Sequence, residues 1–219
     1  MNKSQLGKIL ESIPEEVFES LEPQDLSFET SDVINLLSKN EELQKPNSKI
    51  YSFFKKLLIA KYAAHYSEHN VLEESLGVKI NFPLFSFGNI NSRHFFGIDE
   101  LLIHDFYIRN KNRYKYVADI GCNCGLHSKI LCELGYEVDS YEPDQKHIEM
   151  SMALLSGYKN NNFFQKAVSN YTGKATFTRI INNSTGSYIN DKKKSYGPIE
   201  TYEVEVINAF DLSFKYDLI

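Results

Sequence analysis

Apolar residues recur at helical spacing in the first third of the chain. The longest stripe begins after Pro46-Asn47-Ser48 and consists of Tyr51, Phe54, Leu58, Tyr62 and Tyr66. Residues three or four apart share one face of a helix, so this stripe predicts a long amphipathic helix. Shorter stripes occupy residues 6–13, 17–21 and 33–37, and Ser31-Asp32 can cap the last of them. We therefore expect residues 1 to about 76 to be helical.

Residues 77–97 mix aromatic residues with turn-forming ones. Five phenylalanines stand among Gly77, Pro83 and Gly88. This pattern predicts a connecting loop or a short hairpin whose aromatic side chains pack onto the protein. The alternative is a lid over a cofactor cleft. A helix is expected next, from Ile98 to Ile108.

From Tyr114 onward the pattern alternates between strands and helices. Buried strands are expected at residues 114–120, 136–142 and 162–165, and the helices between them begin at Leu126 and after Pro143-Asp144. This order is typical of a parallel sheet with crossover helices. In residues 175–180 and 202–206 side chains of two kinds alternate, as in strands with one buried face. We expect these two strands to form an antiparallel pair added to the parallel sheet. The predicted fold class is α/β.

A glycine-rich turn separates the first of these strands from its helix. Gly121 and Gly125 allow positive φ angles and a close approach of a ligand to the main chain. A dinucleotide-binding G-x-G-x-x-G motif would need glycines where Asn123 and Leu126 stand, which argues against NAD or FAD. The pattern acidic-x-Gly-x-(Gly/Asn)-x-Gly of S-adenosylmethionine sites is fulfilled from Asp119 to Gly125.

An acidic residue at the end of the second strand supports a nucleoside ligand. Glu142 follows Asp119 by 23 residues. A carboxylate at this place can accept hydrogen bonds from ribose hydroxyls. The alternative for Glu142 is a solvated carboxylate at a strand end.

Three segments together resemble a known family. Residues 119–128, Glu142-Pro143-Asp144, and Lys166-Ala167-Val168-Ser169 with Gly173 resemble the FkbM-type family of class I S-adenosylmethionine-dependent methyltransferases, over residues 114–219. The resemblance implies a Rossmann-like fold, S-adenosylmethionine as cofactor, and methylation of a hydroxyl on a sugar, glycan or secondary metabolite. It implies that Ala167 lies near the adenine. The implied cofactor-binding residues are Asp119, Gly121, Asn123, Gly125, Ser128, Glu142, Pro143 and Ala167.

Several polar side chains near the turn keep two interpretations. Ser128 can bind the methionine carboxylate of the donor or cap the helix. His127 can contact the same carboxylate or be a capping or surface histidine, and Ser187 can contact a ligand or belong to a surface loop. The lysines at 192–194 fit a solvated loop or an anionic glycan partner. The sequence identifies no catalytic base.

Composition and charge narrow the class of protein. The chain has 219 residues and a net charge of −5, which argues against a nucleic-acid partner. Its three cysteines form no disulfide or zinc pattern, and free thiols suit the cytoplasm. His65 and His69 are four residues apart but have no third ligand in the sequence, so no metal site is predicted. No apolar run reaches the length of a membrane span, about 20 residues.

The predicted organisation is a helical N-terminal extension, residues 1–113, followed by a Rossmann-like methyltransferase domain, residues 114–219. A fourth parallel strand begins at Lys215 and the sequence ends within it, so we expect either that the chain is a fragment of a longer enzyme or that a partner completes the sheet. Two other functions stay open: a methyltransferase for another acceptor (a small molecule, a protein or a nucleic acid), and a non-catalytic binding module. The sequence does not indicate an oligomeric state.

Overall fold

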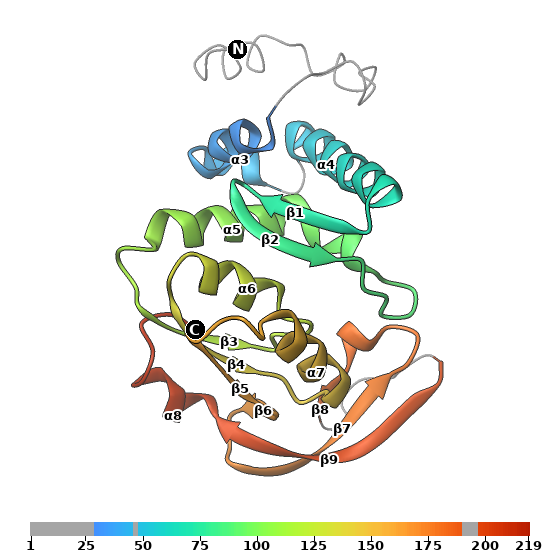
Figure 1. Cartoon of the computed structure of the whole chain (residues 1–219), viewed down its shortest axis with the longest axis vertical. Coiled ribbons are helices and arrows are strands. Elements are labelled where there is room, and N and C mark those ends of the chain that lie inside the picture. The colour runs from blue at the N-terminus through green and yellow to red at the C-terminus, as the bar shows by residue number, and fades with distance from the viewer. Residues whose placement is uncertain (1–28, 46–47, 190–196) are drawn as a thin grey trace.

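The computed structural model describes residues 29–45, 48–189 and 197–219 (Figure 1). The stripes expected at residues 6–13 and 17–21 and the lysines at 192–194 lie outside the described residues. The first described elements are α3 (Thr30–Ser38), the short 3₁₀ helix η2 (Glu41–Gln44), α4 (Lys49–Glu68), β1 (Val71–Ser75), β2 (Val78–Pro83), the 3₁₀ helix η3 (Ser92–Phe96) and α5 (Ile98–Asn110).

The long helix α4 begins where the sequence predicts, since the Ser48 side chain accepts a hydrogen bond from the N–H of Tyr51. Helix α3 begins at Thr30 after Glu29, so Ser31-Asp32 does not form its cap. Residues 71–75, expected to be helical, instead form strand β1, which pairs antiparallel with β2. The positive φ angles of Leu76 and Gly77, +49° and +81°, form the tight turn between them.

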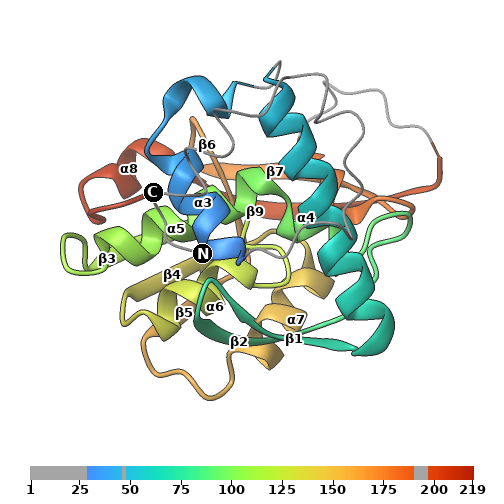
Figure 2. The ribbon, with the colours of Figure 1, turned by 90° about the horizontal axis from the view of Figure 1, so that it is seen from above.

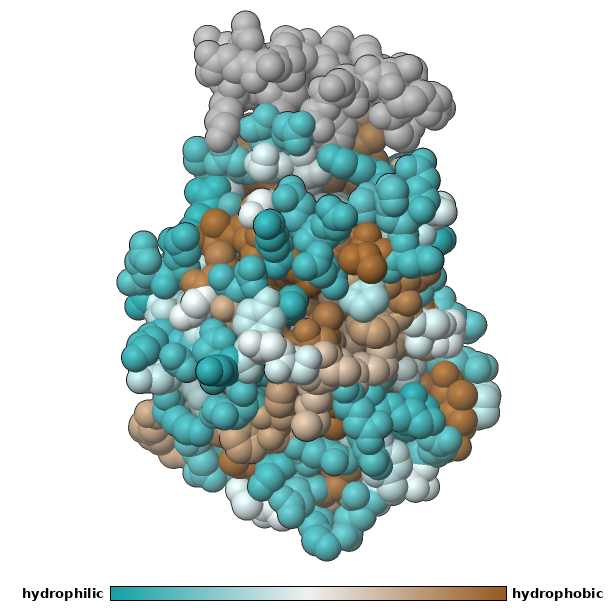
Figure 3. Space-filling view, in the orientation of Figure 1, coloured by the Kyte–Doolittle hydropathy of each residue, from teal (hydrophilic) through white to brown (hydrophobic). Residues whose placement is uncertain are grey.

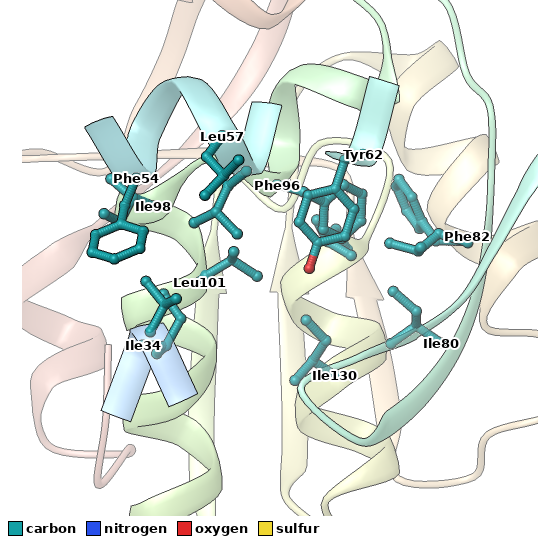
Figure 4. Packing of buried hydrophobic residues seen from close by; sticks show 14 of the residues in the cluster. Ile34, Phe54, Leu57, Tyr62, Ile80, Phe82, Phe96, Ile98, Leu101 and Ile130 are labelled. Carbon is teal, nitrogen blue, oxygen red and sulfur yellow. The ribbon is translucent and has the colours of Figure 1, made fainter. Parts of the chain in front are cut away.

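The largest hydrophobic core joins these elements to the glycine turn region. Figure 4 shows side chains from α3, α4, the hairpin, η3 and α5 converging around Tyr62 and Phe96, whose rings stack at 5.1 Å. Phe82, Phe87 and Phe96 are buried, so the aromatic residues of this segment pack inward as predicted. Cys124, Leu126 and Ile130 belong to the same core, which therefore crosses the predicted boundary at residue 113. That boundary stays a prediction.

The middle of the molecule is a three-stranded parallel sheet. Its elements are β3 (Tyr116–Ile120), α6 (Leu126–Glu133), β4 (Glu137–Tyr141), α7 (Gln145–Leu154) and β5 (Asn161–Phe164). The strand order is β3-β4-β5, with Asp119 opposite Ser140. Val117 and Val138 pack with Leu131 of α6 on one face, while Ala118 packs with Leu212 on the other. The predicted alternation of strands and helices is confirmed here.

The remaining strands form a second, mixed sheet. It contains β6 (Lys166–Ser169), β7 (Gly173–Ile180), β8 (Tyr188–Ile189) and β9 (Ile199–Asn208) in the order β6-β9-β7-β8, with the 3₁₀ helix η4 (Ser184–Gly186) before β8 and α8 (Ala209–Ser213) after β9. The predicted antiparallel pair is confirmed as β7 and β9, but it belongs to this separate sheet. This sheet curls at one end of the described part of the molecule, and α3 and α4 lie at the opposite end (Figure 1). In the view from above, α3 and α4 lie in front of the sheet (Figure 2).

The end of the chain returns to the parallel sheet. Leu218 forms a parallel bridge with Val117, and the N–H of Ala118 donates to the carbonyl of Leu218 at 3.0 Å. The carboxylate of Asp217 accepts from the N–H groups of Lys115 and Tyr116. The parallel direction expected for the fourth strand is therefore confirmed, although only one residue pair, Val117 and Leu218, forms a bridge.

No helix in the described ranges is long and apolar enough to cross a membrane. On the face drawn in Figure 3 hydrophilic residues dominate, and apolar residues gather in smaller groups across its middle.

The loop that follows β2 meets the loop that follows β7 at Gly88. Gly88 bridges Asn183, and the N–H of Asn89 donates to the carbonyl of Asn182 at 2.8 Å. A Cβ atom added at Gly88 would lie 2.4 Å from the carbonyl carbon of Asn182. Only glycine fits this approach, which ties the N-terminal segment to the second sheet.

We predict that Gly88→Ala destabilises the protein more than Gly77→Ala. Both glycines have positive φ, +88° and +81°, so both substitutions add left-handed strain of about 1–2 kcal/mol. Gly77 has no atom within 4 Å of the added Cβ, whereas Gly88 meets backbone, which costs about 1–3 kcal/mol more. Urea unfolding measures both, and equal losses would contradict the close contact at Gly88.

Candidate functional site

The turn between β3 and α6 has a left-handed backbone at three positions. The φ angles are +72° at Gly121, +54° at Asn123 and +87° at Gly125. The N–H groups of Gly121 and Cys122 both donate to the carbonyl of Tyr141, at 2.8 and 3.1 Å. A Cβ atom at Gly125 would lie 2.4 Å from Oγ of Ser151, so helix α7 packs directly on the turn.

Glu142 connects the turn to the start of α7. Its carboxylate accepts from the N–H of Asn123 at 2.9 Å and from the N–H of Asp144 at 2.8 Å. The side chain is 6% exposed, so it is not the solvated strand-end group of the alternative interpretation. Burial raises the pKa of Glu142 to about 7, although the two backbone N–H groups oppose the shift.

Asp144 continues this arrangement into the second sheet. One carboxylate oxygen caps α7 by accepting from the N–H groups of Lys146 and His147. The other accepts from Nε of Arg179 on β7 at 2.6 Å, and the two side chains are 1% and 11% exposed. This buried ion pair fixes β7 against the carboxyl end of β4.

Asp119 and Ser128 are part of a polar chain across the sheet. The Ser128 hydroxyl donates to Asp119 at 2.5 Å and lies 2.7 Å from the Ser140 hydroxyl, which lies 2.9 Å from the amide oxygen of Asn161. The amide nitrogen of Asn161 has no partner among the described residues. If the oxygen and nitrogen of the Asn161 amide are exchanged, the amide donates to Ser140, Ser140 donates to Ser128, and Ser128 donates to Asp119, so that every hydrogen in the chain has an acceptor. Ser128 thus orients Asp119.

Three further residues complete the list of sequence predictions. Pro143 is partly buried between Glu142 and Asp144. Ala167 lies on β6 and is buried in the core of the second sheet, with Ala175 and Val206. The Ser187 hydroxyl donates to the carbonyl of Ser184 at 2.7 Å and accepts from the N–H of Ile180, so it closes its own loop.

Two cavities border the turn. The smaller, about 160 Å³, is lined by Phe95, Glu100, Leu126, His127 and residues 121–124 of the turn. The larger, about 440 Å³, lies along β3 and is lined among others by Asp119, Gly121, Tyr107 and Leu218. Gly121 and His127 line both. Glu142 lines neither of these two.

Asn123 contributes an unused acceptor to the turn. Its Oδ1 atom is buried and has no hydrogen-bond partner among the described residues. A buried acceptor without a partner is costly, and ligands often supply the missing donor. Because Asn123 lines the smaller cavity, a ligand with an N–H or ammonium group fits this wall.

His127 contacts residues that the sequence analysis did not single out. Its Nε2 lies 2.9 Å from Oε2 of Glu100 and its Nδ1 lies 3.1 Å from the hydroxyl of Tyr107. Burial alone would lower the pKa of His127, but the bond to Glu100 and the charge of Asp119 outweigh it, and the pKa is raised. His104 lies beside it, with ring centroids 5.5 Å apart. The spacing of Glu100 and His104, four residues on one helix, was the available sequence signal.

The cysteines of the turn region are buried thiols. Burial raises the pKa values of Cys122, Cys124 and Cys132, so all three stay protonated at neutral pH. His65 and His69 lie next to each other on α4 and its cap, and Nε2 of His65 lies 3.0 Å from the carbonyl of Val71.

Comparison of the chain with protein-family models and with curated proteins gives no match.

We predict that Glu142→Gln weakens the pH dependence of stability. The folded protein holds the proton up to about pH 7, whereas the unfolded chain releases it near pH 4.5. The unfolding free energy of the wild type therefore falls as pH rises through this interval, by on the order of 3 kcal/mol from Glu142. Denaturant unfolding at a series of pH values measures the difference between the two proteins.

Glu149, exposed on the same helix α7, provides the matched control. Glu149→Gln is expected to keep the wild-type pH dependence. If the unfolding free energies of the wild type and Glu142→Gln change with pH in parallel, the Glu142 carboxyl is already ionised at pH 5 and the prediction is wrong.

Proposed function

We propose that the chain is an S-adenosylmethionine-dependent methyltransferase of FkbM type that methylates a hydroxyl oxygen. In this proposal β3, α6, β4, α7 and β5 are the first half of a Rossmann-like class I fold. The acceptor is a sugar, a glycan or a secondary metabolite. The proposal combines the sequence motifs with the geometry of the glycine turn.

The hydrogen bond from the N–H of Asn123 to Glu142 is the observation that carries the proposal. It brings the Asp119–Gly125 motif and the acidic residue of the second strand into one site. A dinucleotide site would instead need glycine at position 123 for the pyrophosphate. An asparagine in the left-handed region is tolerated there, and its side chain can also bind a ligand.

The charged and unpartnered polar groups near the turn fit S-adenosylmethionine, the methyl donor. S-adenosylmethionine carries a sulfonium and an ammonium group, and the Asp119 carboxylate beside Gly121 favours such cations. The unpartnered Oδ1 of Asn123 can accept from the ammonium group. Each oxygen of Glu142 accepts one backbone N–H and keeps a second lone pair. The side chain lines neither of the two cavities at the turn, so its contact with a ribose hydroxyl stays a prediction.

The residues of this site orient rather than react. Methyl transfer proceeds in line from the sulfonium to the acceptor oxygen, so correct positioning supplies much of the rate. Ser128 holds Asp119, and Glu142 holds the turn. The cavity of about 440 Å³ along β3 has the size of a small-molecule site.

We predict that the wild-type chain binds S-adenosylhomocysteine at micromolar concentration and that Gly121→Ala weakens this binding at least tenfold. The added methyl group strains the left-handed turn and intrudes on the ligand. Gly135→Ala is the matched control. Gly135 has a φ of +89° and Gly121 one of +72°, and an added Cβ would have no atom within 4 Å at either position. Calorimetric titration measures each affinity, and circular dichroism verifies folding.

Equal binding by both variants would contradict a donor site at the turn. Tighter binding of NAD than of S-adenosylhomocysteine would assign the turn to a dinucleotide instead.

A further inference from the structure

We propose that Glu100, His104 and His127 bind a divalent transition-metal ion, with Zn²⁺ the best match. Glu100 and His104 come from α5, and His127 comes from the first turn of α6. Their potential ligand atoms all lie within 4.8 Å of one another. Sequence spacing did not predict this site, because its third member lies on another helix.

The three ligand atoms need only small movements to surround an ion. Around a tetrahedral zinc ion with bonds of about 2.0–2.2 Å, neighbouring ligand atoms lie roughly 3.4 Å apart. Nε2 of His127 and Oε2 of Glu100, now 2.9 Å apart, would separate slightly, and the longer distances in the group, up to 4.8 Å, would shorten. The side chains of His127 and Glu100 are 26% and 38% exposed, so both can rotate to make these adjustments.

His104 gives independent support for a ligand. Its side chain is completely buried, yet its Nε2 atom has no hydrogen-bond partner among the described residues. An imidazole nitrogen left without a partner in a core is costly, and a metal ion would satisfy it.

The other ring nitrogens are held as in metal sites. Nδ1 of His104 lies 3.1 Å from the hydroxyl of Ser75, and Nδ1 of His127 lies 3.1 Å from that of Tyr107. Metal-binding histidines typically donate the second N–H to such an oxygen, which fixes the ring and leaves the other nitrogen as ligand. Here Nε2 of His104 has no partner among the described residues, and Nε2 of His127 contacts only Glu100, itself a proposed ligand.

The type of ligand selects the ion. Two imidazoles and one carboxylate suit Zn²⁺ and other transition metals, whereas Mg²⁺ and Ca²⁺ prefer oxygen alone. Three protein ligands leave a coordination position for water or a ligand oxygen. Because Glu100 and His127 line the cavity of about 160 Å³ at the glycine turn, an ion held by them lies in the wall of that cavity.

Calorimetric titration of the full 219-residue chain with Zn²⁺, after treatment with a chelator, tests the site. We expect one ion per chain with micromolar or tighter affinity. Glu100→Gln and His127→Gln should each weaken binding more than tenfold, and Tyr107→Phe, which removes only the support of His127, roughly tenfold. Circular dichroism verifies that each variant is folded.

His69→Gln is the matched control, because His65 and His69 are the other close histidine pair, with ring centroids 5.1 Å apart. It should bind Zn²⁺ like the wild type. Co²⁺ in place of Zn²⁺ should give visible bands of a four- or five-coordinate ion without thiolate charge transfer, which excludes Cys122 and Cys124.

The proposal is overturned if the folded chain binds no Zn²⁺, or if Glu100→Gln and His127→Gln bind it as tightly as the wild type. It is also overturned if His69→Gln abolishes the binding, or if Co²⁺ gives a thiolate charge-transfer band. This titration is independent of the donor titration. If the chain binds S-adenosylhomocysteine but no metal, only the proposed metal site is rejected. If it binds the metal but no S-adenosylhomocysteine, only the proposed methyltransferase function is rejected.

Discussion

The buried carboxylate of Glu142 is the interaction on which the site depends. It accepts backbone N–H groups from both the glycine turn and the start of α7, so neither segment can move without exposing an unpaired carboxylate. Asp144 extends this control, since it caps α7 and pairs with Arg179 of the second sheet. Breaking a buried pair leaves an uncompensated charge, which costs about 3–5 kcal/mol. The segment Glu142-Pro143-Asp144 thereby joins the glycine turn, helix α7 and the second sheet.

Local patterns made much of the fold predictable. The glycine turn, the strands and helices around it and the long helix α4 all follow from spacing of apolar residues and from capping residues a few positions away. Asp119 and Glu142 were predictable as candidate site residues from local sequence, because each stands at the end of a strand in a parallel sheet. Glu142 is nevertheless buried, because Asn123 and Asp144 supply N–H donors that a sequence pattern does not reveal.

Contacts between distant segments were not predictable. Strand β1 forms because its partner β2 follows a tight turn, and this outweighs the helical spacing that ends near residue 70. Ala167 joins the second sheet because β9, far along the chain, pairs with β6. Ser128 binds Asp119 rather than capping its helix, since β4 places Ser140 beside it. The group of Glu100, His104 and His127 depends on the packing of α5 against α6 in the same way.

The N-terminal segment is therefore part of the site. Its aromatic core includes Leu126 and Ile130 of α6, so the position of the helix that follows the glycine turn depends on α4, α5 and the hairpin. Phe95 and Glu100 complete the wall of the smaller cavity opposite the turn. Asn123 offers an acceptor, and Glu100 and His127 offer ligands for a cation, so the polar groups of this cavity favour positive charge. A ligand at the turn and an ion on α5 would share one cavity, so the binding of each would change the electrostatic field that the other experiences.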